Sequence, residues 1–511
     1  MILFLISFGG SYVTVKRNLI DLPKYFESQQ AEERLLDRWG NHALQDANER
    51  FGFFMGEKKD QNWFLPMPPP NITGQLHLGH AMFLTLQDIK HRHLALEGHE
   101  TLWLPGTDHA GLATHEKILE QLELNGQSAD DLEAYWSTGW EWKEKFHGRI
   151  TSQMKKMGIS CHWDKERFTL DESYQSSARH AFKKCWEAGL IYHEEGQWYL
   201  DMKPLAKPLL EALGDGTLTI NPEKSKNKML NFFKKLEPWC ISRQIPWGMA
   251  IPLKNHEGQW LLDEGEQTPG IPCSDTLDTW FLSSLWPFAS LGWPEKTPDF
   301  EKFYPGQWME TGEDILFFWC AKMWMMGYFL TGQWPFKTIF LHGLIRDKKN
   351  QKMSKSLGNG IDPLEIMEQY GTDALRWHLA YRAEPGKDMK FNPEALRHDS
   401  SWLNKIWQAG RYLSQYRCEG AEWKCPDDLI QLRCEIAQLL KEDRYPDACR
   451  LLQKAFRDDY CNGWLEENKE GIREGSEPIR HEAWSRFAFL LGMLHPFIPF
   501  LSTHLMDELH M

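Results

Sequence analysis

The sequence has no C-x-x-C pair, although it contains ten cysteines. Zinc ribbons need closely spaced cysteine pairs, and disulfide scaffolds are short secreted chains with regularly spaced cysteines. Neither class fits a chain of 511 residues whose cysteines stand singly. We therefore expect a reducing, cytoplasmic setting.

A hydrophobic run long enough to cross a bilayer, which takes about 20 apolar residues, is also missing from the sequence. Residues 1–8 are apolar, but no positive charge precedes them and no small-residue cleavage site follows. We expect this run to be a start-site extension or a short docking segment. No membrane partner is expected.

An excess of positive charge is lacking as well, since the formal net charge is −14. This excludes a general nucleic-acid coat protein, because nonspecific binding to phosphates depends on a positive field. A local patch still leaves RNA binding open, although a lysine-rich stretch is commonly just a solvated surface. Its members are Lys224, Lys226, Lys228, Lys234 and Lys235.

Apolar residues make up 42% of the chain and charged residues 25%, so disordered and fibrous classes are excluded. The length of 511 residues predicts roughly three or four domains.

Strand and helix patterns alternate in the region after residue 60. A short apolar run at residues 63–66 precedes a proline-rich loop, and apolar residues at helical spacing follow from Leu78 to Leu96. Gly98 is placed to end this helix, and a second buried strand is predicted at residues 101–104. The order predicts a parallel βαβ unit and the start of a doubly wound α/β sheet.

Later segments repeat these patterns and then become helical. We predict helices between residues 130 and 189, a connector from 196 to about 255, strands at 279–282 and 338–342, and a helix at 314–330. After residue 391 the apolar spacing is helical throughout, which predicts an all-α helix bundle.

Two histidines, His77 and His80, lie three residues apart at the predicted start of the first helix. They share one face with unpaired backbone N–H groups and the positive end of the helix dipole. Such a site can stabilise charge on an α-phosphate under attack, and Gly79 lets a nucleotide approach the backbone. Taken alone, paired histidines at a helix start are more often ordinary polar caps.

A second motif, Lys352-Met-Ser-Lys-Ser356, lies between polar turns and is predicted to be a mobile loop. Lys352 and Lys355 could close on the β and γ phosphates as pyrophosphate leaves. A solvated lysine and serine loop is the alternative if the motif is taken alone.

The two motifs resemble the HIGH and KMSKS signatures of class I aminoacyl-tRNA synthetases. Further blocks resemble the valyl branch over about residues 22–510; they begin at Pro68, Leu104, Trp239, Leu277, Leu285, Asp314, His342 and Asn404. The block Gly106-Thr-Asp-His-Ala-Gly111 favours valyl over isoleucyl and leucyl relatives, which carry a different motif there. The resemblance implies a doubly wound parallel Rossmann-type sheet in two halves, followed by an all-α helix bundle.

The resemblance also implies a reaction. Valine or a similar small aliphatic amino acid would attack ATP, with Mg²⁺ on the phosphates, and the acyl group would pass to tRNA. His77, His80, Lys352 and Lys355 would serve the phosphates. Residues implied to bind ATP are Thr73, Gly79, Gly312, Asp314, His342, Gly343, Met353, Ser354 and Ser356. Residues implied to bind the amino acid are Pro69, Asn71, Asp108 and Trp280.

Within that set, Asp108 would accept hydrogen bonds from the α-ammonium group. Plain core packing is the alternative role for Trp280.

Six parts of the chain are expected. They are an N-terminal extension with a helical entry (1–60), the first half of the catalytic domain (61–195), a connector in place of the editing insertion (196–275), the second half of the catalytic domain (276–345), the KMSKS loop and stem-contact region (346–395), and an anticodon-binding-type helix bundle (396–511).

Two parts of the usual valyl enzyme are expected to be missing. Residues 189–196 resemble the block before the editing insertion and run directly into residues 197–206, which resemble the block after it. The C-terminal coiled-coil arm is also expected to be absent. Smaller departures are Glu313, where the family usually has an aromatic residue, and residues 248–252, where it usually has a histidine and a basic residue.

We therefore predict no editing in cis. A hydrophobic pocket separates valine from threonine by only ~10²-fold, a value already known for valyl enzymes.

Three functions stay open at this point. The chain could be a compact synthetase that charges tRNA-Val, or a paralogue that supplies activated amino acid or aminoacyl-tRNA to a biosynthetic pathway. It could also be a non-catalytic RNA-binding or regulatory paralogue, against which the two intact motifs argue. A monomer is favoured.

Overall fold

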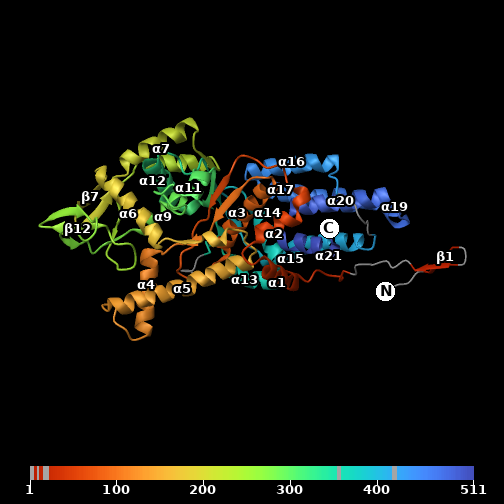
Figure 1. Cartoon of the computed structure of the whole chain (residues 1–511), viewed down its shortest axis with the longest axis horizontal. Coiled ribbons are helices and arrows are strands. Elements are labelled where there is room, and N and C mark those ends of the chain that lie inside the picture. Colours follow the sequence, from red (N-terminus) through yellow and green to blue (C-terminus); the bar gives the residue numbers. More distant parts are fainter. Residues whose placement is uncertain (1–4, 9–10, 15–21, 354–357, 417–422) are drawn as a thin grey trace. The chain divides into compact units, whose positions relative to one another are not determined.

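The computed structural model describes residues 5–8, 11–14, 22–353, 358–416 and 423–511. The chain divides into two compact units, and Figure 1 labels many of their elements. The helical unit comprises residues 1–56, 365–382 and 392–511. The α/β unit comprises residues 57–364 and 383–391.

The α/β unit begins with the predicted βαβ element. Strands β3 (Trp63–Pro66) and β4 (Thr101–Leu104) pair in parallel, and helix α3 (Leu78–Leu96) connects them. Both strands are largely buried, as the continuous apolar runs of a covered parallel sheet require. Gly98 follows α3 with φ of 88°, a left-handed conformation that favours glycine. The sequence prediction for this element is confirmed.

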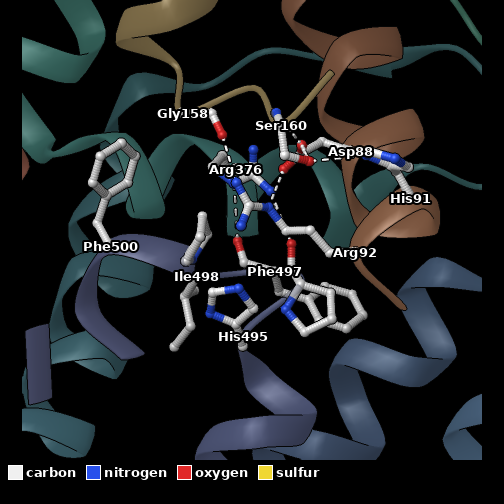
Figure 2. Close-up of polar contacts among 12 residues, drawn as sticks. Asp88, His91, Arg92, Gly158, Ser160, Arg376, His495, Phe497, Ile498 and Phe500 are labelled. Carbon is white, nitrogen blue, oxygen red and sulfur yellow. Dashed lines mark hydrogen bonds and ion pairs between the residues drawn. The ribbon is translucent and has the colours of Figure 1, made fainter. Parts of the chain in front are cut away.

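A buried ion pair holds α3 to the segment that follows α5 (Leu132–Lys156). Arg92 donates to Asp88 at 2.8 Å and to the Gly158 carbonyl at 2.7 Å (Figure 2). Asp88 Oδ1 also accepts hydrogen bonds from the backbone N–H and the hydroxyl of Ser160. Both charged side chains are fully buried, so removal of either one would leave an uncompensated charge in the core.

A second parallel sheet has the strand order β16-β17-β9. Strand β17 (Thr338–His342) pairs in parallel with β16 (Trp308–Gly312) on one side and with β9 (Thr219–Asn221) on the other. The predicted strand at 338–342 is confirmed. β9 lies in the segment that we expected to be a connector, so that segment also contributes a strand to the sheet.

Residues 279–282 do not form the predicted strand. They belong to helix α9 (Thr279–Ser283), which directly follows the short strand β15 (Thr276–Leu277). The prediction was wrong because a short apolar run has no periodicity that separates a buried strand from a buried helix.

The predicted helix at 314–330 is present as one continuous helical stretch. It consists of the 3₁₀ turn η3 (Glu313–Ile315), the π-helix η4 (Leu316–Cys320) and α12 (Ala321–Thr331). A π segment inside a helix is rare and commonly marks a functional site. Helix α7 (Lys203–Asp215) packs against α12 (Figure 1).

The remaining elements of the α/β unit are short strands and covering helices. The helices are α4 (Gly111–Leu124), η2 (Trp163–Lys165), α6 (Glu172–Glu187), α8 (Lys224–Phe233), α10 (Trp286–Ala289) and α11 (Pro298–Phe303). The strands are β5 (Gly106–Thr107), β6 (Arg167–Phe168), β7 (Ile191–Glu194), β8 (Gln197–Leu200), β10 (Trp239–Cys240), β11 (Ser242–Arg243), β12 (Leu253–His256), β13 (Gln259–Leu262), β14 (Ile271–Pro272), β18 (Ile345–Arg346) and β19 (Met389–Lys390). Helices α5 and α6 confirm the helical prediction for residues 130–189.

In the described residues of the helical unit, β1 (Leu5–Phe8) and β2 (Ser11–Thr14) form a hairpin, and the other regular elements are helices. Its helices are α1 (Ser28–Trp39), α2 (Ala43–Arg50), η1 (Gly52–Phe54), α14 (Thr372–Arg382), α15 (Pro393–Leu413), α16 (Asp427–Lys441), α17 (Tyr445–Lys454), the π-helix η5 (Ala455–Trp464), α18 (Leu465–Glu467), α19 (Lys469–Glu474), α20 (Glu477–Leu494) and α21 (Pro499–Leu509). Helix α13 (Pro363–Tyr370) begins in the α/β unit and ends in this one. The predicted helical C-terminal region is confirmed.

Within the helical unit, the turn between α20 and α21 is held by Arg376 of α14. This side chain donates to the carbonyls of Pro496 at 2.8 Å and Phe497 at 3.3 Å (Figure 2). The guanidinium thus satisfies two backbone carbonyls of the turn that joins the helices. Across the described ranges, no helix is long and apolar enough to span a membrane.

Candidate functional site

A cavity of about 770 Å³ in the α/β unit collects the residues predicted from the sequence. Segments that follow β3, β4, β16 and β17 line it, which is the strand edge where doubly wound sheets bind ligands. The lining includes Pro69, Asn71, Thr73, His77, Gly79, His80, Asp108, Trp280, Gly312, Asp314, His342, Gly343, Lys352 and Met353. The other three predicted residues, Ser354, Lys355 and Ser356, lie outside the described part of the chain. The roles assigned to all of them stay predictions.

The histidine pair caps the N-terminus of α3. His77 Nδ1 accepts the backbone N–H of Gly79 at 3.0 Å, and His80 Nδ1 accepts the backbone N–H of His77 at 3.1 Å. Because both Nδ1 atoms act as acceptors, each neutral ring carries its proton on Nε2. Both rings line the cavity, so each can offer it an N–H donor. The polar cap and the anion site are therefore compatible readings of the same pair.

Gly79 has no room for a side chain. A Cβ at this position would lie 2.7 Å from Cε1 and 2.9 Å from Nδ1 of the His77 ring. The glycine therefore allows His77 to fold back over the first turn of α3.

Asp108 lies where the β3 and β4 segments continue to pair beyond the strands. Its backbone N–H donates to the Pro70 carbonyl at 3.0 Å, and its carbonyl accepts from Ile72 at 3.2 Å. Its carboxylate accepts from the backbone N–H of Ala110 at 2.7 Å and from the Ser283 hydroxyl. Burial raises the pKa of Asp108, whereas the nearby His109 and these two hydrogen bonds lower it. The loop therefore holds a nearly buried carboxylate at the cavity wall.

Lys352 contacts Asp314 across the cavity rim. The Nζ to Oδ2 distance is 2.6 Å, and the two side chains are 48% and 37% exposed. An ion pair this exposed contributes about 0.2–1 kcal/mol. Lys352 can therefore leave Asp314 for a ligand phosphate at little cost.

Several cavity residues were missed by the sequence analysis, among them Arg243, Asp278 and Ser283. Arg243 and Asp278 form an ion pair at 2.9 Å, and Trp239 Nε1 donates to the same carboxylate at 2.9 Å. Arg243 and Asp278 lie in the blocks that begin at Trp239 and Leu277. The signal that could have revealed these two residues was a charged side chain within a largely apolar stretch of sequence.

Lys322 of α12 lies close to this ion pair, with its Nζ 3.5 Å from the centre of the Trp239 ring. Burial lowers the pKa of Lys322 to about 8, although Asp278 opposes the shift.

Glu313, one of the departures from the family pattern, contacts α8. Its carboxylate accepts from Ser225 at 2.8 Å and from Lys228 at 2.5 Å. Lys224 of the same patch donates to the Gly386 carbonyl at 2.9 Å. Lys234, also of the patch, donates to Asn231 Oδ1 at 2.9 Å. At least three of the five patch lysines thus have intramolecular partners, and RNA binding by the patch stays a prediction. The residues that the structure describes include no group of three or more side chains suited to hold a metal ion.

The parallel sheets and the cavity at their carboxyl edge define a Rossmann-type α/β enzyme. A family model described as "tRNA synthetases class I (I, L, M and V)" matches residues 38–196, 192–268 and 271–392, and the chain belongs to this family. It is therefore an aminoacyl-tRNA ligase.

Similar curated proteins include two bacterial valine–tRNA ligases. The protein of Carboxydothermus hydrogenoformans is 28% identical, over 96% of this chain and 79% of the relative. The protein of Geobacter sulfurreducens has the same values. One similar solved structure is the LeuRS–tRNA–LeuAMS ternary complex of Agrobacterium radiobacter. It has a TM-score of 0.73 and 15% sequence identity, and the match covers 95% of this chain and 89% of that chain. A methionyl-tRNA synthetase of Mycobacterium tuberculosis bound to methionyl-adenylate has a TM-score of 0.68, 17% identity, and coverage of 88% and 93%. The two structures support the fold alone.

Proposed function

We propose that this chain activates valine with ATP and transfers it to tRNA-Val, without editing in cis. The observation that carries the proposal is the cavity, which gathers residues from the His77, Asp108, Trp280, His342 and Lys352 segments. The valine–tRNA ligases among the relatives favour valine over the other amino acids of the family.

In the first step, the valine carboxylate would attack the α-phosphate of ATP and displace pyrophosphate. The Nε2–H groups of His77 and His80 would donate to the oxygens on which charge develops, and the positive end of the α3 dipole would add to the favourable field there. Lys352 would exchange Asp314 for the leaving pyrophosphate, as would Lys355 from the neighbouring loop. This arrangement places positive charge where it stabilises the transition state more than the bound substrate.

Asp108 would hold the amino acid by its ammonium group. Its carboxylate already accepts two hydrogen bonds, and an ionised carboxylate has further lone pairs for the ligand. Pro69, Asn71 and Trp280 would enclose the side chain. Trp280 itself lines the cavity, and its ring centroid lies 6.4 Å from that of Phe318, which is not a lining residue.

Mg²⁺ would enter with the nucleotide. Mg²⁺ commonly takes most of its ligands from substrate phosphates and water, with one or two carboxylates. That mode fits the described residues, which offer no ready cluster of ligands. The ion would neutralise the charge of the phosphates that it binds.

The proposal of no editing in cis rests on the β7–β8 hairpin. These strands are joined by a two-residue turn, Glu195-Gly196, with φ of 50° and 76°. Two left-handed residues are typical of a tight type I′ hairpin turn. In the valyl pattern this is where the editing insertion would leave the catalytic domain.

The alignment with the Carboxydothermus protein supports the same conclusion. It runs over 709 positions, so at least 198 of them face no residue of this 511-residue chain. Two matched segments of the family also meet at residues 192–196, within the hairpin.

Amino-acid-dependent exchange of labelled pyrophosphate into ATP tests activation directly. Run across all twenty amino acids, it should show valine as the best substrate and threonine as a weaker one. No exchange with any amino acid would refute an activating enzyme. Charging of total tRNA then separates a tRNA ligase from a paralogue that hands its adenylate to another acceptor.

Editing is tested with pre-formed Thr-tRNA. We expect the purified chain to leave this ester intact over times in which an editing synthetase clears it. Rapid hydrolysis by the chain alone would refute the proposal, provided that a matched Val-tRNA sample stays intact.

A further inference from the structure

Glu310 is a buried carboxylate in β16 that contacts a cavity residue without lining the cavity itself. Its side chain is fully buried, and one oxygen contacts Nδ1 of His342 in β17. His342 lines the cavity and lies opposite Gly312 in the parallel register. A Cβ placed on Gly312 would lie 3.6 Å from His342 Nε2, so this second ring nitrogen faces the Gly312 edge.

The neighbours of Glu310 determine which of its atoms accept hydrogen bonds. Trp103 Nε1, which can only donate, contacts Gln87 Oε1 at 2.7 Å. The amide nitrogen of Gln87 therefore faces Glu310, where it donates to Oε2 and to the backbone carbonyl, each at 3.2 Å. The other carboxylate oxygen contacts His342 Nδ1, and because an ionised carboxylate can only accept, Nδ1 carries the proton in this contact.

We propose that Glu310 is a positioning residue that keeps the proton of His342 on Nδ1, so that Nε2 accepts a hydrogen bond from a ribose hydroxyl of ATP. The inference rests on the proposed function, because it requires a nucleotide in the cavity. The same Cβ on Gly312 would lie 2.7 Å from Asp314 Oδ1. Two acceptors thus flank Gly312, and adjacent acceptors suit sugar hydroxyls, which can donate, rather than phosphate oxygens.

The variant Glu310→Gln separates this role from simple packing, because it keeps the size of the side chain. Gln87 still presents its amide nitrogen, so the oxygen of Gln at position 310 turns toward it and the new amide nitrogen faces His342. Nδ1 must then accept, and the ring proton moves to Nε2. A ring with Nε2–H can no longer accept from a ribose hydroxyl.

Exchange assays with ATP, 2′-deoxy-ATP and 3′-deoxy-ATP measure the lost hydrogen bond. In the wild type, one deoxy analogue should raise KM for the nucleotide about tenfold, the size of one net hydrogen bond. In Glu310→Gln, KM for ATP should rise by the same factor and the discrimination should disappear, while KM for the amino acid stays unchanged. Retained discrimination in this variant would overturn the inference.

A double variant provides the rescue. With Gln87→Glu added to Glu310→Gln, the carboxylate at 87 accepts from Trp103 and from the amide at 310. The amide oxygen at 310 then accepts from His342 Nδ1–H, so discrimination between the nucleotides should return. A merely structural role for Glu310 predicts no such return, and its absence would count against the inference.

The tautomer can also be read without any activity. In protein labelled with ¹⁵N-histidine, the His342 signals are assigned by their loss in His342→Gln. Nδ1 should be the protonated nitrogen in the wild type and Nε2 in Glu310→Gln. A wild type that shows no exchange would refute the proposed function, whereas an Nε2–H tautomer in the wild type would refute the inference alone.

Asp399→Asn is the matched control. Asp399 contacts His378 Nδ1 at 2.7 Å in the helical unit, and neither residue lines the cavity. The control removes the charge of a comparable buried pair. It should lower stability without changing the ratio of KM values for ATP and the deoxy analogues, and a changed ratio would show that the assay reports stability.

Discussion

Replacement of Glu32 by glutamine should stabilise the helical unit increasingly as pH rises. Glu32 of α1 accepts from the Thr372 backbone N–H at 2.8 Å and from its hydroxyl at 2.7 Å. Burial, and secondarily the charge of Asp373, raise the pKa of Glu32 from its usual 4.5 to about 8, although the Thr372 hydrogen bonds oppose the shift. The folded protein therefore keeps this proton at pH values where the unfolded chain has released it.

The sign follows from proton binding. Between pH 4.5 and about 8 the folded state binds more protons than the unfolded state, so stability falls as pH rises. Each pH unit in this window removes about 1.4 kcal/mol, and the accumulated loss at neutral pH is about 3 kcal/mol. The stabilising contribution is complete below pH 4.5 and is lost as pH rises through about 8.

Glutamine keeps both contacts without the charge, because its oxygen can accept from the Thr372 N–H and its amide can donate to the hydroxyl. We expect Glu32→Gln to exceed the wild type by about 3 kcal/mol in the free energy of opening near pH 7, and by little near pH 4.5. Hydrogen exchange of peptides from α1 and α14, measured by mass spectrometry, reports this opening locally and needs no two-state unfolding of the whole chain.

Glu33→Gln is the control, since Glu33 is the exposed neighbour on the same helix. It should leave the pH dependence of exchange unchanged. If Glu32→Gln showed the same slope with pH as the wild type, the burial of an uncharged Glu32 would be refuted.

Three further predictions concern the α/β unit. Gly79→Ala should lower kcat for pyrophosphate exchange by about 10²-fold, the effect of losing one transition-state donor, because its Cβ would displace the His77 ring; an unchanged kcat would contradict the placement of His77. Asp108→Asn should raise KM for the amino acid by roughly 10- to 100-fold, the value of a hydrogen bond to a charged group, and leave KM for ATP unchanged. Equal effects on the two KM values would contradict the role of Asp108 in binding the ammonium group. Burial lowers the pKa of Lys322 to about 8, so wild-type stability should rise with pH between about 8 and 10.5 as the unfolded chain binds the extra proton. Lys322→Met should remove that rise and stabilise the protein by about 3 kcal/mol near pH 7, as chemical denaturation would show, and a persisting rise would assign it to another group.

The βαβ unit could be predicted from the sequence because each boundary has a local cause. Prolines end β3, and Gly98 ends α3 in a left-handed conformation that only a residue without Cβ adopts freely. α9 and β9 had no such signal. α9 is five residues of mixed apolar character, and β9 is three residues long with one buried side chain, so neither shows a period.

The residues of the candidate site also divide into those that the sequence could predict and those that it could not. Residues such as His77 and Lys352 belong to short motifs whose spacing predicts a chemical task. Glu310 and Ser283 belong to no motif, and their importance depends on partners distant in the chain, His342 and Asp108. Sequence periodicity can predict that a position is buried, but it does not reveal which side chain the polar atoms at that position contact.

Two ion pairs of the α/β unit illustrate how one structure can be rigid and exchangeable at once. Arg92 and Asp88 are fully buried, and they also bind Gly158 and Ser160, respectively. Separating the pair would leave two unpaired charges away from water, which is strongly destabilising. Helix α3 is thereby fixed, and with it the histidines at its N-terminus. Lys352 and Asp314 are 48% and 37% exposed, so water can replace either partner. A fixed helix and an exchangeable lysine on the same cavity suit a reaction in which one group of phosphates must be held while the other leaves.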